Sequence, residues 1–323
     1  MRNYSLDILK FICAITVVII HCPIPANIRL FTTGLESCAV PLFFMMSGYF
    51  TFNRNNLQST LAKRTKSILK LSTIALLAYT FLFYIKTYEI ESLRITHIQV
   101  WDFIGLNQPP FGKHLWYLFA YSYILVIIKY IDKYNLYKPL FYTIIPLLIT
   151  GLCIGKYSGL VLGETKESII SRNFLFTGLP FFTIGMWIRK ITHDRAITLN
   201  SKKIFAALIL TYIISFIEST TLNVRNGLGD LYITTVPLSI LIMMLCLSIK
   251  KSNDNFFSRA GREYGLYIYI VHYAVISDIL YKKSMEHNWG MDVNEIVFPP
   301  AAITLTAAII FILKKTRFIG KVI

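Results

Sequence analysis

Apolar positions in this chain fall in long runs, and polar or charged positions fall in the short links between them. Ten windows hold enough apolar residues to cross, or nearly cross, a hydrocarbon core about 30 Å thick. The second and sixth windows are short. The pattern predicts an all-α fold, a single polytopic membrane bundle of about ten helices within residues 1–323. The windows cover residues 6–24, 38–53, 68–86, 115–131, 139–155, 173–188, 203–218, 231–249, 264–281 and 296–313.

Composition and charge agree with a membrane protein. Apolar residues make up 55% of the chain, which is high for a soluble domain. The formal net charge is +16, and with the N-terminus inside, most lysines and arginines fall in the inner links and the C-terminal tail. The positive-inside rule then predicts that both termini are cytoplasmic. Because this charge reports topology, we expect contact with membrane lipid and none with nucleic acid.

Several kinds of chemistry lack their sequence signals. The five cysteines are scattered, odd in number and without the spacing of metal ligands. They predict neither a disulfide framework nor a metal site, although one bridge between Cys22 and Cys38 stays open. The chain has no Gly-x-Ser-x-Gly elbow, no Walker loop and no His-Glu-x-x-His motif, which disfavours the corresponding hydrolases, ATP-driven pumps and metalloenzymes. No permanently bound cofactor is expected.

Two ionisable residues, Lys10 and His21, lie in the first apolar window. Such residues are costly in a membrane and often mark function. Eleven helical steps leave only about 20° of net rotation, so both would project from one face, about 16 Å apart. The alternative is that Lys10 snorkels from a helix end and that His21 lies at the opposite interface.

A family resemblance bears on this choice. The first window contains Leu-Asp-x-x-Lys, then ten residues, then His21. A later segment, at residues 40–50, reads Val-Pro-Leu-Phe-Phe-Met-Met-Ser-Gly-Tyr-Phe. This opening resembles the acyltransferase 3 family, integral-membrane enzymes that mostly O-acetylate extracytoplasmic glycans. The family usually has arginine where this chain has Lys10, a change that keeps the charge but loses the bidentate fork of arginine.

A cationic group follows the second window. Lys63, Lys66 and Lys70 share one helical face, and Arg64 lies beside them. They could serve topology and attraction to anionic lipid alone. The resemblance implies instead that Lys63, Arg64 and Lys66 hold the phosphates of coenzyme A, because members commonly carry two basic residues at this spacing.

Three later segments also resemble the family. His-Leu-Trp-Tyr-Leu, which contains His114 and Trp116, follows the long outer link, although an interfacial aromatic belt is the alternative. Arg172 precedes a Gly- and Pro-containing segment similar to the branch that includes the membrane part of vancomycin-resistance serine racemases. His272 ends a partial match to a Tyr-x-x-His string, in which Gly265 replaces the usual serine, and it could equally be a packing histidine.

The resemblance implies transfer of an acetyl or similar acyl group from cytoplasmic acyl-coenzyme A to a hydroxyl of an extracytoplasmic glycan or cell-envelope polymer. The membrane would be a bacterial-type cytoplasmic membrane. His21 would act as general base, or carry the acyl group transiently, since neutral imidazole suits both roles. The remaining predicted roles are donor binding by Lys10, Lys63, Arg64 and Lys66, catalytic support by His114, and substrate binding by Trp116, Arg172 and His272.

Two other functions stay open. A transporter of a small amino acid such as serine, or of an acyl-carrying metabolite, would use Lys10 and His21 as a relay. The chain shows no paired Gly-interrupted segments in matching halves, which would indicate inverted repeats. A scaffold or lipid-binding protein without turnover is the third possibility.

Overall fold

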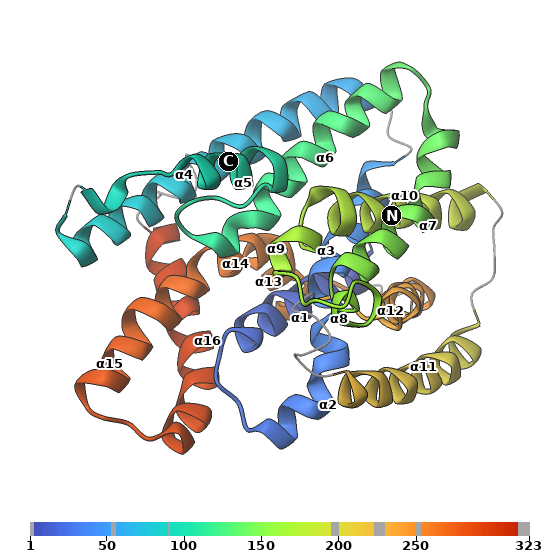
Figure 1. The fold of residues 1–323 in the computed structure, drawn as a ribbon. Coiled ribbons are helices and arrows are strands. Elements are labelled where there is room, and N and C mark those ends of the chain that lie inside the picture. The colour runs from blue at the N-terminus through green and yellow to red at the C-terminus, as the bar shows by residue number, and fades with distance from the viewer. Residues whose placement is uncertain are drawn as a thin grey trace. The chain divides into compact units, whose positions relative to one another are not determined.

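The computed structural model describes residues 3–52, 56–89, 91–194, 200–222, 230–249 and 253–315, and these residues form helices joined by short links (Figure 1). No strand occurs within these ranges. The chain divides into two compact units. Unit 1 takes its described residues from Met1–Phe43, Thr198–Leu222 and Tyr232–Lys321, and unit 2 takes them from Phe44–Ile197 and Asn223–Leu231. The all-helical prediction is confirmed.

Unit 1 is built around the first helix and the C-terminal helices. Buried side chains such as Val18, Val275 and Phe298 form one hydrophobic core that joins α1, α14, the π-helix η5 and α16. Cys22 belongs to this core. Both Cys22 and the buried Cys38 are free thiols. The helices are α1 (Tyr4–Ile20), α2 (Ala26–Glu36), α11 (Ser201–Thr221), α12 (Thr235–Ser248), α13 (Phe256–Glu263), α14 (Gly265–Ala274), η5 (Val275–Leu280), α15 (Tyr281–Glu286) and α16 (Met291–Lys315).

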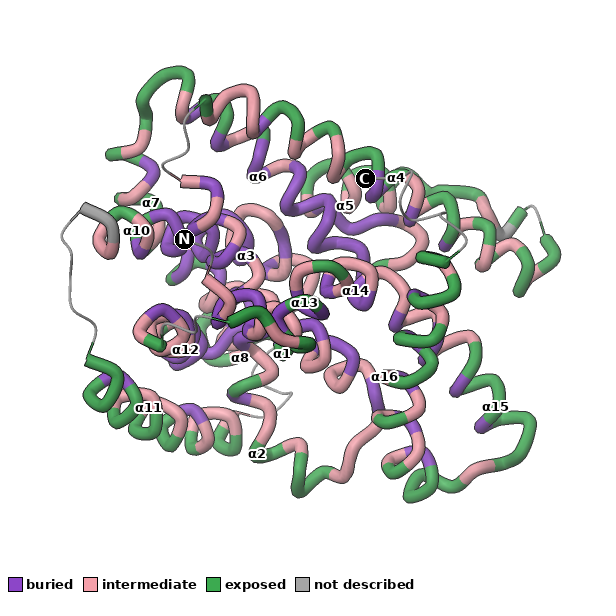
Figure 2. Tube along the Cα trace, turned by 180° about the vertical axis from the view of Figure 1, so that it is seen from behind, coloured by how far each residue is buried: buried purple, intermediate pink, exposed green. Residues whose placement is uncertain are grey.

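Unit 2 is built around α6 (Trp116–Lys133), and Figure 2 shows this helix as largely buried. Buried residues such as Leu118, Ile124 and Phe181 form its interior. Helix α3 (Ala39–Thr51) begins in unit 1 and continues into unit 2 at Phe44. The other helices are α4 (Leu57–Thr87), η1 (Glu91–Leu93), α5 (His97–Leu106), η2 (Lys113–Leu115), α6 (Trp116–Lys133), α7 (Tyr137–Ile154), α8 (Ser158–Val161), α9 (Ser168–Ser171), the π-helix η3 (Phe174–Gly178) and α10 (Leu179–Asp194).

Polar residues set several helix starts. The Asn3 side chain accepts from the Leu6 amide at α1, and Asn200 caps α11 in the same way. Thr96 with Gln99 forms a capping box at α5. These side chains satisfy amides that lack partners in the first turn. The long outer link predicted between the third and fourth spans therefore contains a helix of its own.

Two glycines let α3 and α10 cross with their backbones in contact inside unit 2. A Cβ on Gly48 would lie 2.0 Å from the Phe182 carbonyl oxygen, and one on Gly185 would lie 1.9 Å from the Met45 carbonyl oxygen. Small residues allow such close approach in membrane helices. The Met-Met-Ser-Gly part of the opening motif thus has a packing role.

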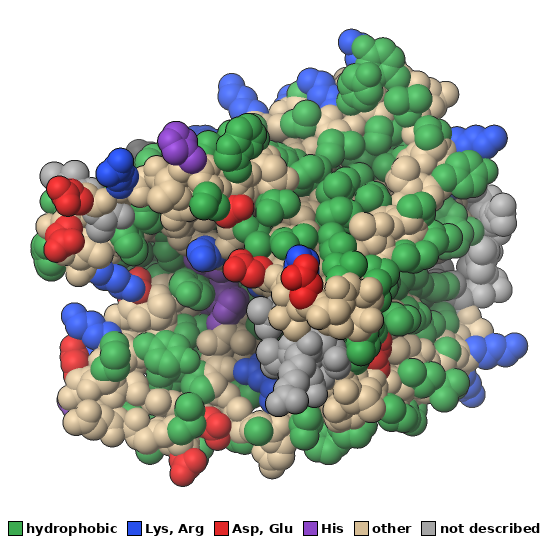
Figure 3. Space-filling view, in the orientation of Figure 1, with side chains coloured by type: hydrophobic (Ala, Val, Ile, Leu, Met, Phe, Trp, Pro, Cys, Tyr) green, Lys and Arg blue, Asp and Glu red, His purple; other side chains and the backbone are tan. Residues whose placement is uncertain are grey.

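Within the described residues, six helical stretches are long and apolar enough to cross a membrane. Four of the ten predicted windows hold shorter helices; α1, for example, has 17 residues and α12 has 14. The count of ten spans and the cytoplasmic termini stay predictions. Several apolar helices confirm the membrane character, and hydrophobic side chains cover much of the surface seen in Figure 3. The six stretches are Ala26–Thr51, Leu57–Thr87, Lys113–Lys133, Tyr137–Ile154, Ser201–Thr221 and Met291–Lys315.

The longest of these helices, α4, has 31 residues. At 1.5 Å per residue it extends about 46 Å, well beyond a hydrocarbon core of about 30 Å. Four of its basic residues, Lys63, Arg64, Lys66 and Lys70, lie in its first half, and Lys86 lies in its last turn. The link between the second and third predicted windows is therefore helical from Leu57 onward, while Arg54 in the same link lies outside the described residues.

Candidate functional site

His21 lies directly after the last residue of α1, in unit 1. Its backbone is still helical, with φ −90° and ψ −5°, and its amide bonds to the Val18 carbonyl at 3.2 Å. The half-buried ring packs against two rings of α14. Its centroid is 5.2 Å from the His272 ring and 5.5 Å from the Tyr273 ring, which it meets edge to face. The structure thus brings the histidines of the first and ninth windows together.

His272 is fully buried, with no exposed surface. Its Nδ1 lies 3.0 Å from the Ile268 carbonyl oxygen. A carbonyl can only accept, so Nδ1 is protonated, and in the neutral form of the ring Nε2 carries the lone pair. The π-helix η5 begins at Val275, three residues after His272, and such single-turn widenings are frequent at functional sites.

Lys10 forms an ion pair near the start of α1. Its Nζ lies 3.5 Å from Asp7 Oδ1, and the Asp7 side chain is only 4% exposed. Arg262 of α13 approaches the other carboxylate oxygen of Asp7 at 3.9 Å and also pairs with Asp254 at 3.1 Å. Gly261 permits this approach, because a Cβ there would lie 1.9 Å from the Asp7 carbonyl oxygen. Lys10 is therefore one member of a charged network between α1 and α13.

His114 is buried in unit 2, in the short η2 turn before α6. Its ring meets the Tyr79 ring of α4 edge to face at 4.6 Å. Gly112 makes the turn with φ +67°, and a Cβ there would lie 3.0 Å from Tyr79. A side chain at this position would therefore be strained and crowded against the partner of His114.

Trp116, two residues later, lies beside Arg172. The Arg172 guanidinium is 5.9 Å from the Trp116 ring centroid, and its Nη1 is 3.4 Å from Asp230 Oδ2. Asp230 also influences Lys156, whose pKa is lowered by burial and partly restored by this carboxylate. Arg172 is thus held between an aromatic face and a carboxylate.

Asn107 forms hydrogen bonds that connect α5 with the starts of α6 and η3 in unit 2. It is fully buried and ends α5 with φ +53°. Its Nδ2 donates to the Trp116 carbonyl at 3.1 Å, and its Oδ1 accepts from the Phe174 amide at 2.7 Å. One side chain therefore fixes the first residue of α6 against the first residue of η3. Arg172 lies two residues before Phe174, so Asn107 also helps to position it relative to Trp116.

The basic residues of α4 separate into two kinds. Lys63, Lys66 and Lys70 are exposed, as expected for one outward face. Arg64 is half-buried and donates to Thr51 Oγ1 of α3 at 2.7 Å. The lysines can meet a ligand in solution, whereas Arg64 joins the helix start to α3.

The structure thus groups the predicted site residues in two sets. Unit 1 holds Lys10, His21 and His272, and unit 2 holds Lys63, Arg64, Lys66, His114, Trp116 and Arg172. Among the described residues, no three His, Cys, Asp or Glu side chains are grouped as metal ligands. Sequence reasoning missed the partners of these residues. Signals existed for Asn107, which stands before Gln-Pro-Pro, and for Asp7, which belongs to the Leu-Asp-x-x-Lys string and lies three residues before Lys10. Arg262, Tyr79, Tyr273 and Asp230 gave none.

Comparisons with known proteins agree on one family. The acyltransferase domain of the acyltransferase 3 family matches residues 3–315. The serine/alanine racemase of Enterococcus gallinarum is 26% identical over 219 residues, which cover 61% of this chain and 31% of the racemase. The match therefore spans about a third of the racemase. No solved structure gives a significant match.

Proposed function

This chain belongs to the acyltransferase 3 family, and we propose that it moves an acetyl or similar acyl group from acyl-coenzyme A to a hydroxyl of an extracytoplasmic glycan or cell-envelope polymer. Its family and its apolar helices make it an integral-membrane acyltransferase. The donor, the acceptor and the cytoplasmic membrane as its location belong to the proposal. The observation that carries it is the packing of half-buried His21 on buried His272.

His21 is the proposed general base. A hydroxyl is a weak nucleophile until a base removes its proton during attack. A nitrogen of His21 takes that proton while the hydroxyl oxygen bonds to the thioester carbonyl carbon. The carbon–sulfur bond then breaks, and the departing coenzyme A sulfur takes the proton from the imidazolium. A transient acyl-imidazole at His21 is the two-step form of the same transfer.

His272 is proposed to act through His21. It is more deeply buried than His21, and its Nδ1–H bond to Ile268 fixes its ring. Together with Tyr273, it presents a rigid surface against which the His21 ring packs. Such support keeps a base in productive orientation. The sequence predicted that His272 contacts the substrate directly. Because the His272 side chain is fully buried, this role is less favoured.

The donor is proposed to bind through cations. The exposed Lys63 and Lys66 can approach the phosphates of coenzyme A, and Arg64 holds this turn through Thr51. Lys10 would add a further contact, oriented by its ion pair with Asp7. Charge-assisted hydrogen bonds to phosphate are among the stronger polar interactions available to a protein.

The acceptor is proposed to meet the set around Trp116. The Arg172 guanidinium lies over this ring. Its planar set of N–H groups can donate hydrogen bonds to the acceptor. His114, held against Tyr79, would orient the acceptor or stabilise the oxyanion. Asn107 fixes the backbone segments that carry Trp116 and Arg172.

Transfer of label tests the proposal. Membranes that contain the full chain are incubated with acetyl-coenzyme A labelled in the acetyl group, and the envelope glycan is isolated. We expect label on glycan hydroxyls with the native chain and none with His21→Gln at equal protein content. Label that stays absent with the native, folded chain, or that survives in the variant, contradicts the proposal.

The racemase match supports one alternative. That relative acts on serine and alanine by name, and it shares 26% identity with part of this chain. A transporter of a small amino acid would show uptake of labelled serine into vesicles that depends on His21, without any acyl product. The same vesicles therefore distinguish the two functions.

A further inference from the structure

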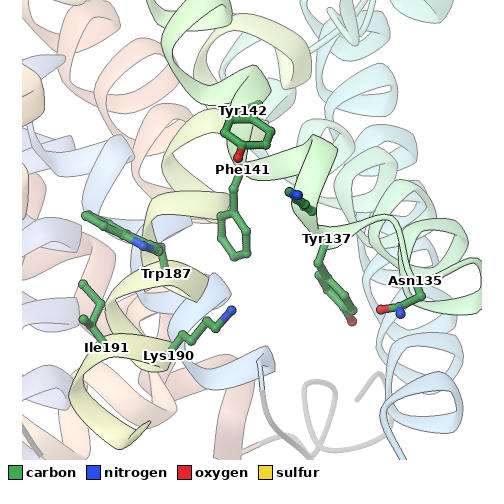
Figure 4. A pocket seen from close by; sticks show the side chains of 8 residues that line it. Asn135, Tyr137, Phe141, Tyr142, Trp187, Lys190 and Ile191 are labelled. Carbon is green, nitrogen blue, oxygen red and sulfur yellow. The ribbon is translucent and has the colours of Figure 1, made fainter. Parts of the chain in front are cut away.

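A pocket lies between the start of α7 and the last turns of α10, and none of the predicted site residues lines it. Its volume is about 600 Å³. Figure 4 shows Trp187, Lys190 and Ile191 of α10 facing Phe141 of α7 across it. Both helices belong to unit 2 and pack on each other. The full lining is Asn135, Tyr137, Lys138, Phe141, Tyr142, Trp187, Lys190 and Ile191.

The charge of this pocket is positive. Lys138 and Lys190 contribute one ammonium group each, and no carboxylate among the described side chains lies within ion-pair distance of either. The nearby Asp132 is engaged elsewhere, since it accepts from Tyr137 Oη at 2.5 Å and also from Gln58. The Lys190 ammonium lies 5.8 Å from the Phe141 ring centroid. Two cations thus line a pocket whose walls are aromatic.

An apolar stripe leads away from the pocket along α7. Tyr142, Ile145 and Ile149 occupy one helical face at i, i+3 and i+7 and are 70%, 67% and 56% exposed. Trp187, at the pocket itself, is 48% exposed. Exposed Trp and Tyr beside lysine are typical of a membrane interface. Because α7 is one of the helices able to cross the membrane, its exposed stripe faces hydrocarbon.

We propose that this pocket binds the headgroup of one anionic glycerophospholipid. Its phosphate lies between Lys138 and Lys190, and its acyl chains follow Tyr142, Ile145 and Ile149 along α7. The combination of cations with an adjoining hydrocarbon-facing stripe selects a lipid over a soluble phosphate, which has no apolar part to occupy the stripe. This site does not depend on the acyl-transfer proposal.

Lipid retention tests the site. The full chain is placed in nanodiscs of equal parts phosphatidylglycerol and phosphatidylcholine, released into mild detergent, and weighed with its retained lipids by native mass spectrometry. We expect phosphatidylglycerol to be retained in preference. Each neutralised lysine should weaken this retention roughly five-fold, since a Lys near an anionic surface contributes about 1 kcal/mol. The double variant Lys138→Gln/Lys190→Gln should therefore lose the preference.

A matched variant controls for charge alone. Lys202→Gln/Lys203→Gln removes the same charge from two exposed lysines at the start of α11 and should keep the preference, as should Lys138→Arg/Lys190→Arg. The proposal is overturned if phosphatidylglycerol and phosphatidylcholine are retained equally, or if the preference survives in the Gln double variant. It is also overturned if inorganic phosphate or free coenzyme A displaces the retained lipid.

Discussion

The imidazole rings of His21 and His272 lie 5.2 Å apart, centroid to centroid, with an angle of 39° between their planes. One ring follows the end of α1 and the other belongs to α14. This contact gives the proposed base a fixed neighbour, and it sets the first two predictions.

Replacement of His21 should stop acyl transfer without unfolding the chain. His21→Gln keeps hydrogen bonding but cannot act as a base at neutral pH, so we expect a loss of about 10²–10⁴-fold in turnover. His21→Ala should be as inactive, because it also lacks the base, and it should stay folded, because it removes a polar group from the bundle instead of adding one. Transfer of labelled acetyl is measured at matched protein content. A well-folded His21→Gln variant with substantial turnover would refute the assignment, and His114 would be examined next.

Replacement of His272 by Phe should slow turnover while donor binding is kept. Phe preserves an aromatic ring beside His21 but removes the Nδ1–H bond to Ile268 that fixes the ring. We expect kcat to fall by about ten-fold or more, with the KM for the donor changed less than two-fold. Tyr269→Phe, in a ring 6.1 Å from His272, is the matched control and should change neither constant appreciably. Equal losses in the two variants would mean a general packing effect.

Neutralising the start of α4 should weaken donor binding. Lys63→Gln/Lys66→Gln removes two exposed charges, and we expect the Kd for coenzyme A to rise steeply at low salt and less at high salt. Arg64→Gln should also lower the melting temperature, because it breaks the bond to Thr51. Binding is measured by titration calorimetry with the full chain in detergent. Lys202→Gln/Lys203→Gln is the control for charge, and a Kd unchanged in the first variant would leave only a topological role.

A methyl group at Gly185 should destabilise unit 2. Its carbon would lie 1.9 Å from the Met45 carbonyl oxygen, so α3 and α10 must separate, and overpacking of this kind costs about 1–3 kcal/mol or more. Gly105→Ala in α5 is the control, since nothing lies within 4 Å of its added Cβ. Thermal unfolding in detergent should show a lower melting temperature for Gly185→Ala alone. Similar melting curves for both variants would contradict the close crossing.

Loss of the Asn107 side chain should destabilise unit 2 through its hydrogen bonds. Glycine tolerates the φ of +53° at this position, so Asn107→Gly removes the bonds to Trp116 and Phe174 without adding backbone strain. Leaving buried groups unsatisfied costs about 1–3 kcal/mol each. Asn288→Gly, at an exposed residue with φ +50°, is the matched control. The melting temperature and acyl transfer should both fall for Asn107→Gly and stay near native for the control.

The sequence predicted the helical class, because apolar runs of membrane length have few other solutions. It also predicted the shared exposed face of Lys63, Lys66 and Lys70. It could not show that His21 meets His272, because long-range helix pairing leaves no local pattern. The π-helices were likewise hidden, since η3 begins at an amide that donates to the distant Asn107 and η5 packs on helices far away in the sequence. Lys10 lies three residues after Asp7, a spacing that places both on one helical face, but the approach of Arg262 to the same carboxylate required the fold.

The crossing of α3 and α10 also constrains motion. Two helices that touch backbone to backbone at Gly48 and Gly185 cannot roll about their axes or slide past each other without collision. The two helices must therefore move together as one rigid body throughout a catalytic cycle. Any opening of unit 2 that admits a substrate must therefore occur at other helix contacts, and spectroscopic labels placed on α3 and α10 should keep a constant separation during turnover.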